Sequence, residues 1–151
     1  RRSSDLYRMS NIVAGIGRGQ LKILDERILQ KKRLFNIYEE AFKDIDEIEM
    51  MPICDYGEPN YWLSCIILKK NSRVKPIDII LALEKENIEA RHIWKPMHLQ
   101  PIFKDFEFYT ISKDGHSISE DIFNRGVCLP SDTKNTDEDM GRIIKIVREL
   151  F

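Results

Sequence analysis

The sequence has no long apolar run and no signal for export. Its longest apolar stretches, residues 65–68 and 79–83, are short, whereas a helix that spans a bilayer needs about 20 apolar residues. The chain also opens without the charged, apolar and small-residue pattern of a secretory signal peptide. We therefore expect a soluble, cytoplasmic protein with no membrane partner.

Cysteine and histidine are scarce, with three residues of each type. The cysteines are widely separated and form no CxxC pair, and the histidines have no HxxxH spacing. This pattern argues against a disulfide framework and a zinc site, and it predicts reduced, mostly buried thiols and no metal. The six residues are Cys54, Cys65, Cys128, His92, His98 and His116.

An excess of charge is also missing. The chain has 24 Lys and Arg residues against 25 Asp and Glu residues, interspersed, for a net charge of −1. Because nucleic acids and anionic membranes attract proteins with a basic surface, neither is expected as a partner. The 151 residues, 42% hydrophobic and 32% charged, are typical of a single globular domain that covers residues 1–151.

The residues that are present point first to the stretch 88–103, which begins as a strand and is then interrupted by two prolines. Alternation up to Trp94 predicts a strand over residues 88–94. Pro96 and Pro101 have no amide hydrogen for a sheet ladder and push the residue before each of them into an extended conformation. Residues 95–100 are therefore expected to form a stiff loop at the strand end.

This loop displays a cation, an imidazole and an amide, from Lys95, His98 and Gln100. Such groups on a rigid loop at a strand end suit a polar or anionic ligand. An ordinary surface connection accounts for the same residues equally well, so the loop pattern alone leaves both interpretations open.

Apolar residues at helical spacing predict one long helix over residues 9–42, capped by Ser10. Gly15, Gly17 and Gly19 weaken its first turns, and they are expected to pack closely against another backbone. A nearly continuous apolar and aromatic run predicts a central strand over residues 61–68.

The second half of the chain adds helices and strands. Pro76 suits the first position of a helix that ends at Asn87, and Thr136 with Asp139 approximates a capping box before the last helix. Residues 126–130 predict a final short strand. The fold class expected is α+β, with a small, largely antiparallel sheet covered by helices and one long N-terminal helix.

Three segments carry a family resemblance. They are RHIWKPMHLQPIF at residues 91–103, YRMSN at residues 7–11 and GVCLPS at residues 126–131, the last followed by TDED at residues 136–139. In this order they resemble motifs of the DegT/DnrJ/EryC1/StrS family, the pyridoxal-phosphate-dependent sugar aminotransferases. The resemblance spans almost the whole chain.

The resemblance implies the C-terminal small domain of a fold type I aminotransferase that acts on a nucleotide-linked keto-sugar, in cell-surface polysaccharide or amino-sugar biosynthesis. In that family pyridoxal phosphate is the electron sink, and its Schiff-base lysine lies on a large N-terminal domain that is absent here. No lysine of this chain has a Schiff-base context. We expect no cofactor on this chain, no catalytic residue and no activity from it alone.

The resemblance also implies that Arg8, Lys95, His98 and Gln100 bind the substrate. The parent protein is expected to be a homodimer in which the segment around Arg8 reaches the partner subunit's active site. This domain would close over the nucleotide sugar and contribute dimer contacts. Trp94 is expected to pack in the core.

One position departs from the family pattern. Residues 4–6 are Ser-Asp-Leu, where the family usually has Gly-Tyr-Asn and the asparagine binds the cofactor phosphate of the neighbouring subunit. Leucine has no polar side-chain atom for that bond. Either these first residues are not native to the chain, or this copy has lost the cofactor contact. On the resemblance as a whole, the chain is expected to be a fragment of such an enzyme or, as the alternative, a non-catalytic binding or regulatory module that retains the scaffold.

Overall fold

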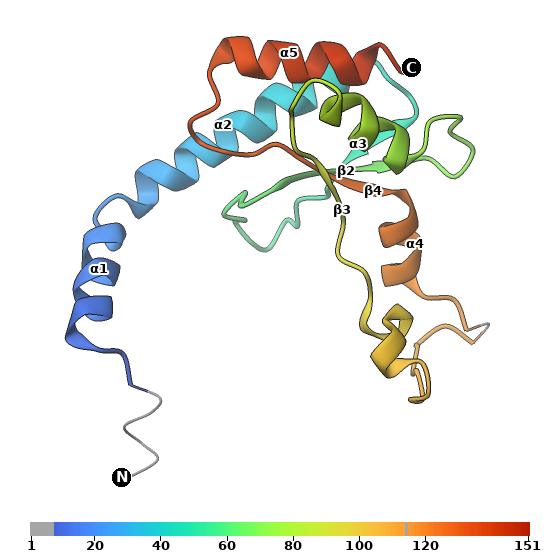
Figure 1. Cartoon of the computed structure of the whole chain (residues 1–151), viewed down its shortest axis with the longest axis horizontal. Helices are drawn as coiled ribbons and strands as arrows, with labels where there is room; N and C mark the ends of the chain where they lie inside the picture. Colours follow the sequence, from blue (N-terminus) through green and yellow to red (C-terminus); the bar gives the residue numbers. More distant parts are fainter. Residues whose placement is uncertain (1–7, 114) are drawn as a thin grey trace.

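The computed structural model describes residues 8–113 and 115–151, and within them helices cover one side of a four-stranded sheet (Figure 1). Neighbouring strands are antiparallel, in the order β1-β2-β4-β3. The predicted α+β class with a small antiparallel sheet is confirmed. The elements in chain order are α1 (Asn11–Leu21), α2 (Leu24–Phe42), β1 (Ile48–Met50), β2 (Ser64–Leu68), α3 (Pro76–Glu84), β3 (Arg91–His92), η2 (Met97–Leu99), η3 (Pro101–Phe103), α4 (Ile118–Arg125), β4 (Gly126–Leu129) and α5 (Asp137–Arg148).

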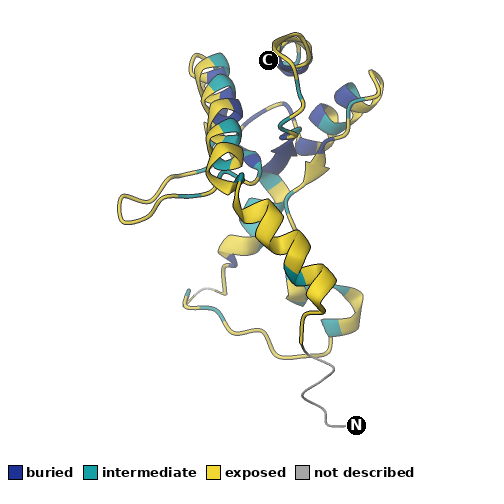
Figure 2. Cartoon of the chain, turned by 90° about the vertical axis from the view of Figure 1, so that its left-hand side faces the viewer, coloured by how far each residue is buried: buried dark blue, intermediate teal, exposed yellow. Residues whose placement is uncertain are grey.

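The core lies between this sheet and helices α2, α3 and α5. Along β2 the buried residues alternate with partly exposed ones, so one face of the strand points into the core. Figure 2 shows the buried residues gathered at the strands and the inner sides of the helices. The largest buried core side chains are those of Tyr38, Phe42, Ile66, Leu68, Ile79, Leu83, Val127, Leu129, Met140 and Val147.

The long helix predicted over residues 9–42 is divided into α1 and α2, which lie at an angle to each other in Figure 1. At the break the amide of Ile23 donates to the carbonyl of Gln20, 3.1 Å away, which is a tighter turn than the α-helical one. Helix α1 has no buried residue (Figure 2). Because α1 buries no residue against the rest of the described chain, packing does not hold it in line with α2. Its direction can therefore change at the break, a few residues after Gly19.

The expectation of close packing at the glycines of α1 is wrong for the described part of the chain. A Cβ atom added at Gly15, Gly17 or Gly19 meets no other atom within 4 Å. The apolar residues of α1 are exposed as well, with Ile12 and Ile16 among them. The spacing predicted the helix correctly, but it carried no information about what lies beside it.

Helix α5 begins as its sequence predicts. The hydroxyl of Thr136 accepts a hydrogen bond from the amide of Asp139 at 3.1 Å, and the Asp139 carboxylate accepts one from the amide of Thr136 at 2.8 Å. This reciprocal capping box satisfies amides that have no partner within the helix. From this start Met140, Ile143 and Val147 point into the core.

Helix α4 continues directly into β4. Arg125 is the last residue of the helix and Gly126 the first of the strand. The guanidinium of Arg125 pairs with Asp121 one turn earlier and donates to the carbonyl of Leu68 in β2. This pairing lowers the pKa of the Asp121 carboxyl below its usual value. The junction is therefore tied both to the helix and to the central strand.

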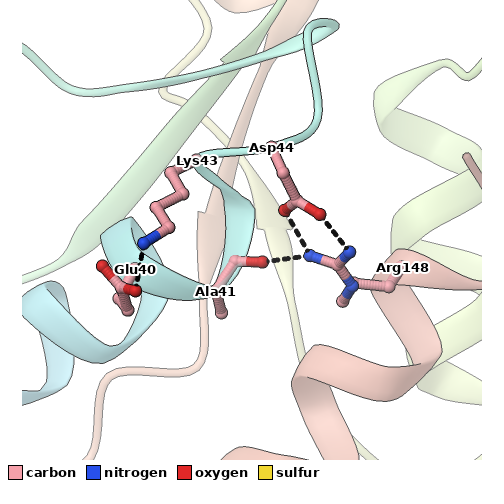
Figure 3. A network of polar contacts seen from close by, with 5 residues as sticks. All are labelled: Glu40, Ala41, Lys43, Asp44 and Arg148. Carbon is pink, nitrogen blue, oxygen red and sulfur yellow. Dashed lines mark hydrogen bonds and ion pairs between the residues drawn. The ribbon is translucent and has the colours of Figure 1, made fainter.

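The C-terminal end of α5 is fastened to the end of α2 by Arg148 (Figure 3). Its guanidinium donates to both carboxylate oxygens of Asp44, at 2.7 Å each, and also to the carbonyl of Ala41. The hydrogen bonds from Arg148 lower the pKa of Asp44 to about 2. Two carboxylate contacts on one guanidinium fix its orientation, which a single contact does not.

This ion pair makes part of the stability depend on pH. Since the pKa of Asp44 is lower in the folded than in the unfolded chain, the ionised carboxylate favours folding above about pH 4, and this contribution is lost as the pH falls towards about 2. Asp44→Asn is expected to lower the melting temperature at about pH 6 and to leave it nearly unchanged at about pH 1, below both pKa values.

Thermal melts followed by circular dichroism at both pH values test this expectation. Asp46→Asn is the matched control, because Asp46 is exposed two residues further along and forms no ion pair within the described residues. A difference between wild type and Asp44→Asn that persists at the lower pH would contradict the role of the ionised carboxylate.

Candidate functional site

The proline-bracketed loop is more regular than its sequence suggests. Strand β3 contains only two residues, Arg91 and His92, not the 88–94 span that was predicted. After it, the short turns η2 and η3 follow each other, held by hydrogen bonds from the amide of Gln100 to the carbonyl of Met97 at 3.0 Å and from the amide of Phe103 to the carbonyl of Gln100 at 2.9 Å. These turns give the loop a fixed shape without a strand partner.

The predicted loop residues lie together but differ in exposure. Lys95 is exposed. Gln100 is half-buried, and its side-chain amide nitrogen lies 3.5 Å from the carbonyl oxygen of Lys95, which brings the two residues together. The side chain of His98 is only 17% exposed. The loop therefore presents Lys95 to solvent more fully than it presents His98.

His98 is turned towards α4. Its ring is stacked on Phe108, with 3.9 Å between the ring centroids, and its Nε2 atom lies 3.5 Å from a carboxylate oxygen of Glu120. That separation permits an ion pair when the ring is protonated, but the buried Nε2 makes no hydrogen bond in the structure. His98 thus connects the loop to α4, with most of its ring covered.

Arg8 is far from the loop in the chain. It is exposed and comes two residues before Ser10, the N-cap of α1. Helix α1 and the loop at residues 95–103 extend from different sides of the molecule in Figure 1, so this chain does not bring Arg8 into the loop cluster. The family departure at residues 4–6 lies outside the described residues.

A pair of neighbouring indoles was not predicted from the sequence. The rings of Trp62 and Trp94 lie 5.8 Å apart between centroids, at 37° to each other, and their residues are 63% and 61% exposed. The expected core position of Trp94 is therefore wrong. Trp62 had been assigned to the strand 61–68, but β2 begins at Ser64. The two exposed indoles belong to residues just before β2 and just after β3.

A local turn places Trp62. Tyr61 has a positive φ of 51°, which is uncommon for a residue other than glycine. The amide of Trp62 donates to the side-chain oxygen of Asn60 at 3.0 Å, as asparagine often allows in turns. The chain therefore turns just before β2, which leaves the indole of Trp62 outside the core.

The two indoles line an open groove of about 600 Å³. Arg91 and His92 of β3 and Cys128 and Ser131 of the β4 segment line it as well. Arg91 is also paired with Glu89, to which its Nε donates at 2.7 Å. Aromatic faces beside a cation suit a ligand that combines a planar or sugar ring with negative charge.

The wall behind the groove is held by hydrogen bonds. The hydroxyl of Ser131 accepts from the amide of Ser64 at 2.9 Å and donates to the carbonyl of Leu129 at 2.8 Å. The hydroxyl of buried Tyr38 donates to the carbonyl of Pro130 at 2.7 Å. The segment after β4 is thus fixed to both the sheet and α2, which makes the groove a preformed surface.

The described residues contain no group of three or more His, Cys, Asp or Glu side chains that is arranged to hold a metal ion. In the same residues, no helix combines the length and the apolar character needed to cross a membrane.

The fold is one found in aminotransferases. PseC of Helicobacter pylori, an aminotransferase involved in the biosynthesis of pseudoaminic acid, has a solved structure that matches with a TM-score of 0.78 at 21% identity, over 95% of this chain and 38% of that one. The family of the chain is established by its sequence. The chain belongs to the DegT/DnrJ/EryC1/StrS aminotransferase family, whose profile matches residues 4–148.

Two curated relatives refine the comparison. EpsN of Bacillus subtilis (strain 168), named for an inferred pyridoxal phosphate-dependent aminotransferase activity, is 42% identical over 96% of this chain. GDP-perosamine synthase of Vibrio cholerae is 29% identical over 96% of this chain. The chain spans 37% of the first relative and 38% of the second. It therefore corresponds to a little over a third of such proteins.

Proposed function

We propose that this chain is the C-terminal small domain of a pyridoxal-phosphate-dependent aminotransferase that acts on a nucleotide-linked keto-sugar. The observation that carries the proposal is the family match over residues 4–148, together with coverage of 37% of EpsN. The large domain that holds the cofactor belongs, in this proposal, to the remaining length of the parent protein. The small domain closes over the substrate and contributes to a homodimer.

The nucleotide sugar is supported by two independent features. The names of two matching proteins, GDP-perosamine synthase and PseC of pseudoaminic acid biosynthesis, refer to sugars. The groove offers the exposed faces of Trp62 and Trp94 for ring stacking, with Arg91 beside them. A base or sugar ring packs on an indole, while a cation attracts the diphosphate that joins base and sugar.

Pyridoxal phosphate itself does not fit this groove. The cofactor requires a lysine for its Schiff base, and none of the described residues that line the groove is a lysine. Glu89, the acidic residue of the lining, is already paired with Arg91. We therefore assign substrate contacts to this chain and derive no chemical step from it.

The four predicted site residues have separate roles in this proposal. Lys95 and Gln100 contact the anionic part of the nucleotide sugar from the loop, and His98 contacts the sugar from the same loop. Arg8, remote from the loop, contacts the ligand bound by the partner subunit. In support of the first assignment, Lys95 is exposed and follows Trp94 directly in the chain.

Intrinsic fluorescence offers a direct test, because the chain has only two tryptophans and both line the groove. Titration of the chain with GDP-mannose, UDP-glucose or dTDP-glucose is expected to quench this fluorescence to saturation. Lys95→Ala is expected to weaken the binding about tenfold through loss of a charge-assisted contact.

Lys85→Ala is the matched control, because Lys85 is also exposed but follows α3. It is expected to bind as the wild type does, and free glucose is expected to cause no saturable quenching. Absence of saturable quenching with all three nucleotide sugars would refute the proposal. An equal loss in both lysine variants would remove Lys95 from the site.

A further inference from the structure

Two free cysteines face each other across the centre of the sheet. Cys65 of β2 is the register partner of Cys128 of β4, and their sulfur atoms lie 3.6 Å apart. Because side chains alternate along a strand, both thiols point away from the core face that carries Ile66 and Val127. The pair was invisible in the sequence, where 62 residues separate the two cysteines.

The ladder geometry suits a covalent link between them. The carbonyl of Cys65 accepts a hydrogen bond from the amide of Met51 at 2.9 Å, so the backbone polar groups of Cys65 point to the β1 side. Towards β4, Cys65 and Cys128 are therefore a non-hydrogen-bonded pair, with Cα atoms about 4.5 Å apart. This separation lies within the range of roughly 4.4–6.8 Å over which disulfides form.

The chemistry of the two thiols is unequal. Their mutual hydrogen bond lowers the pKa of Cys128 and raises the pKa of Cys65, which burial raises further. The thiolate that forms first is thus that of Cys128, with Cys65 as its thiol donor. Cys65 is partly exposed, and Cys128, although only 8% exposed, lines the groove.

We propose that Cys65 and Cys128 form a thiol–disulfide exchange site that is oxidised by small-molecule disulfides. The Cys128 thiolate attacks one sulfur of the reagent, forms a mixed disulfide and releases one reagent thiolate. Cys65 then loses its proton to solvent and attacks the Cys128 sulfur, which releases the second reagent thiolate. The two protein thiols are oxidised to one disulfide, and the reagent disulfide is reduced to two thiols.

Oxidised glutathione is a suitable probe, used on the complete 151-residue chain carrying Cys54→Ser. This background removes the third, exposed cysteine. After reaction under native conditions, intact mass is expected to fall by two hydrogen atoms, and peptide mapping is expected to join the segments that contain Cys65 and Cys128. The internal disulfide is expected to exceed the lasting glutathione adduct at least about tenfold, because the fold holds the resolving thiol in place.

Cys54→Ser/Cys65→Ser is the matched control. It has no resolving thiol, so Cys128 is expected to retain glutathione, and dithiothreitol is expected to remove it. The wild-type chain, which keeps Cys54, is expected to carry one adduct there beside the same internal disulfide. The proposal is overturned by two free thiols after the reaction, by a lasting adduct on the Cys54→Ser chain that is as abundant as the internal disulfide, or by a link between two chains.

Discussion

Gly126→Ala is expected to lower the free energy of unfolding by about 3 kcal/mol. A Cβ atom at this position would lie 2.2 Å from Cδ1 of Ile93 and 2.6 Å from the backbone oxygen of Ile122. The backbone of Gly126 has a φ of −101°, which other residues adopt readily. The steric clash is therefore the cause of the expected loss of stability. The isoleucine can rotate, but the oxygen belongs to α4 and cannot move without the helix.

Urea unfolding followed by circular dichroism measures this effect. Gly141→Ala in α5 is the matched control, because a Cβ atom there meets nothing within 4 Å; this change is expected to stabilise the chain by about 0.5–1 kcal/mol. Adding Ile93→Ala to Gly126→Ala is expected to restore only part of the loss, since the Ile122 oxygen remains. Similar unfolding midpoints for Gly126→Ala and wild type would show that the junction yields easily.

Phe42→Ala is expected to cost about 4 kcal/mol of unfolding free energy. Phe42 is the last residue of α2, is 2% exposed, and lies nearly parallel to Tyr38 with 5.9 Å between ring centroids. Truncation leaves a cavity between α2 and the sheet, and the neighbouring Arg148–Asp44 pair holds the helix end so that it cannot collapse into that cavity.

The same helix provides the control. Leu29 is exposed on α2, and Leu29→Ala is expected to change the unfolding free energy by less than about 0.5 kcal/mol. The two variants together separate burial from helix propensity, because both place alanine in α2. Equal effects of the two substitutions would indicate that Phe42 contributes no more than a surface residue.

Local signals in the sequence predicted the ends of helices well. Ser10 caps α1, Pro76 begins α3 and Thr136 caps α5, as expected. Asn87 adopts a positive φ of 57° after α3. Each of these positions depends on hydrogen bonds or torsion angles within a few residues, and the chemistry of the single side chain decides the outcome.

Features that depend on contacts between distant segments were predicted less well. Strand β1, residues Ile48–Met50, was not predicted, because it has only three residues and its pairing with β2 cannot be read from the sequence. The break between α1 and α2 cannot be located from the sequence, because helical spacing continues through it. β3 and β2 are both shorter than expected, since the sequence pattern extends beyond the paired residues.

The same difference between local signals and contacts of distant segments holds for the candidate site. The prolines and polar residues of the loop were evident from the sequence, and the family motifs pointed to the sugar aminotransferases. The pairing of Trp62 with Trp94 and of Cys65 with Cys128 requires the strand register. That register is fixed by the core packing of the whole sheet, which no short segment encodes.

The direct passage from α4 into β4 has a mechanical consequence. Because no linker residue separates the helix from the strand, a tilt of α4 is expected to move β4 as well. The loop at residues 95–103 lies beside α4 where His98 approaches Glu120, and α4 leads directly into β4, the strand that carries Cys128. We therefore expect a movement of the loop to be passed through α4 to β4, the strand that helps to line the groove.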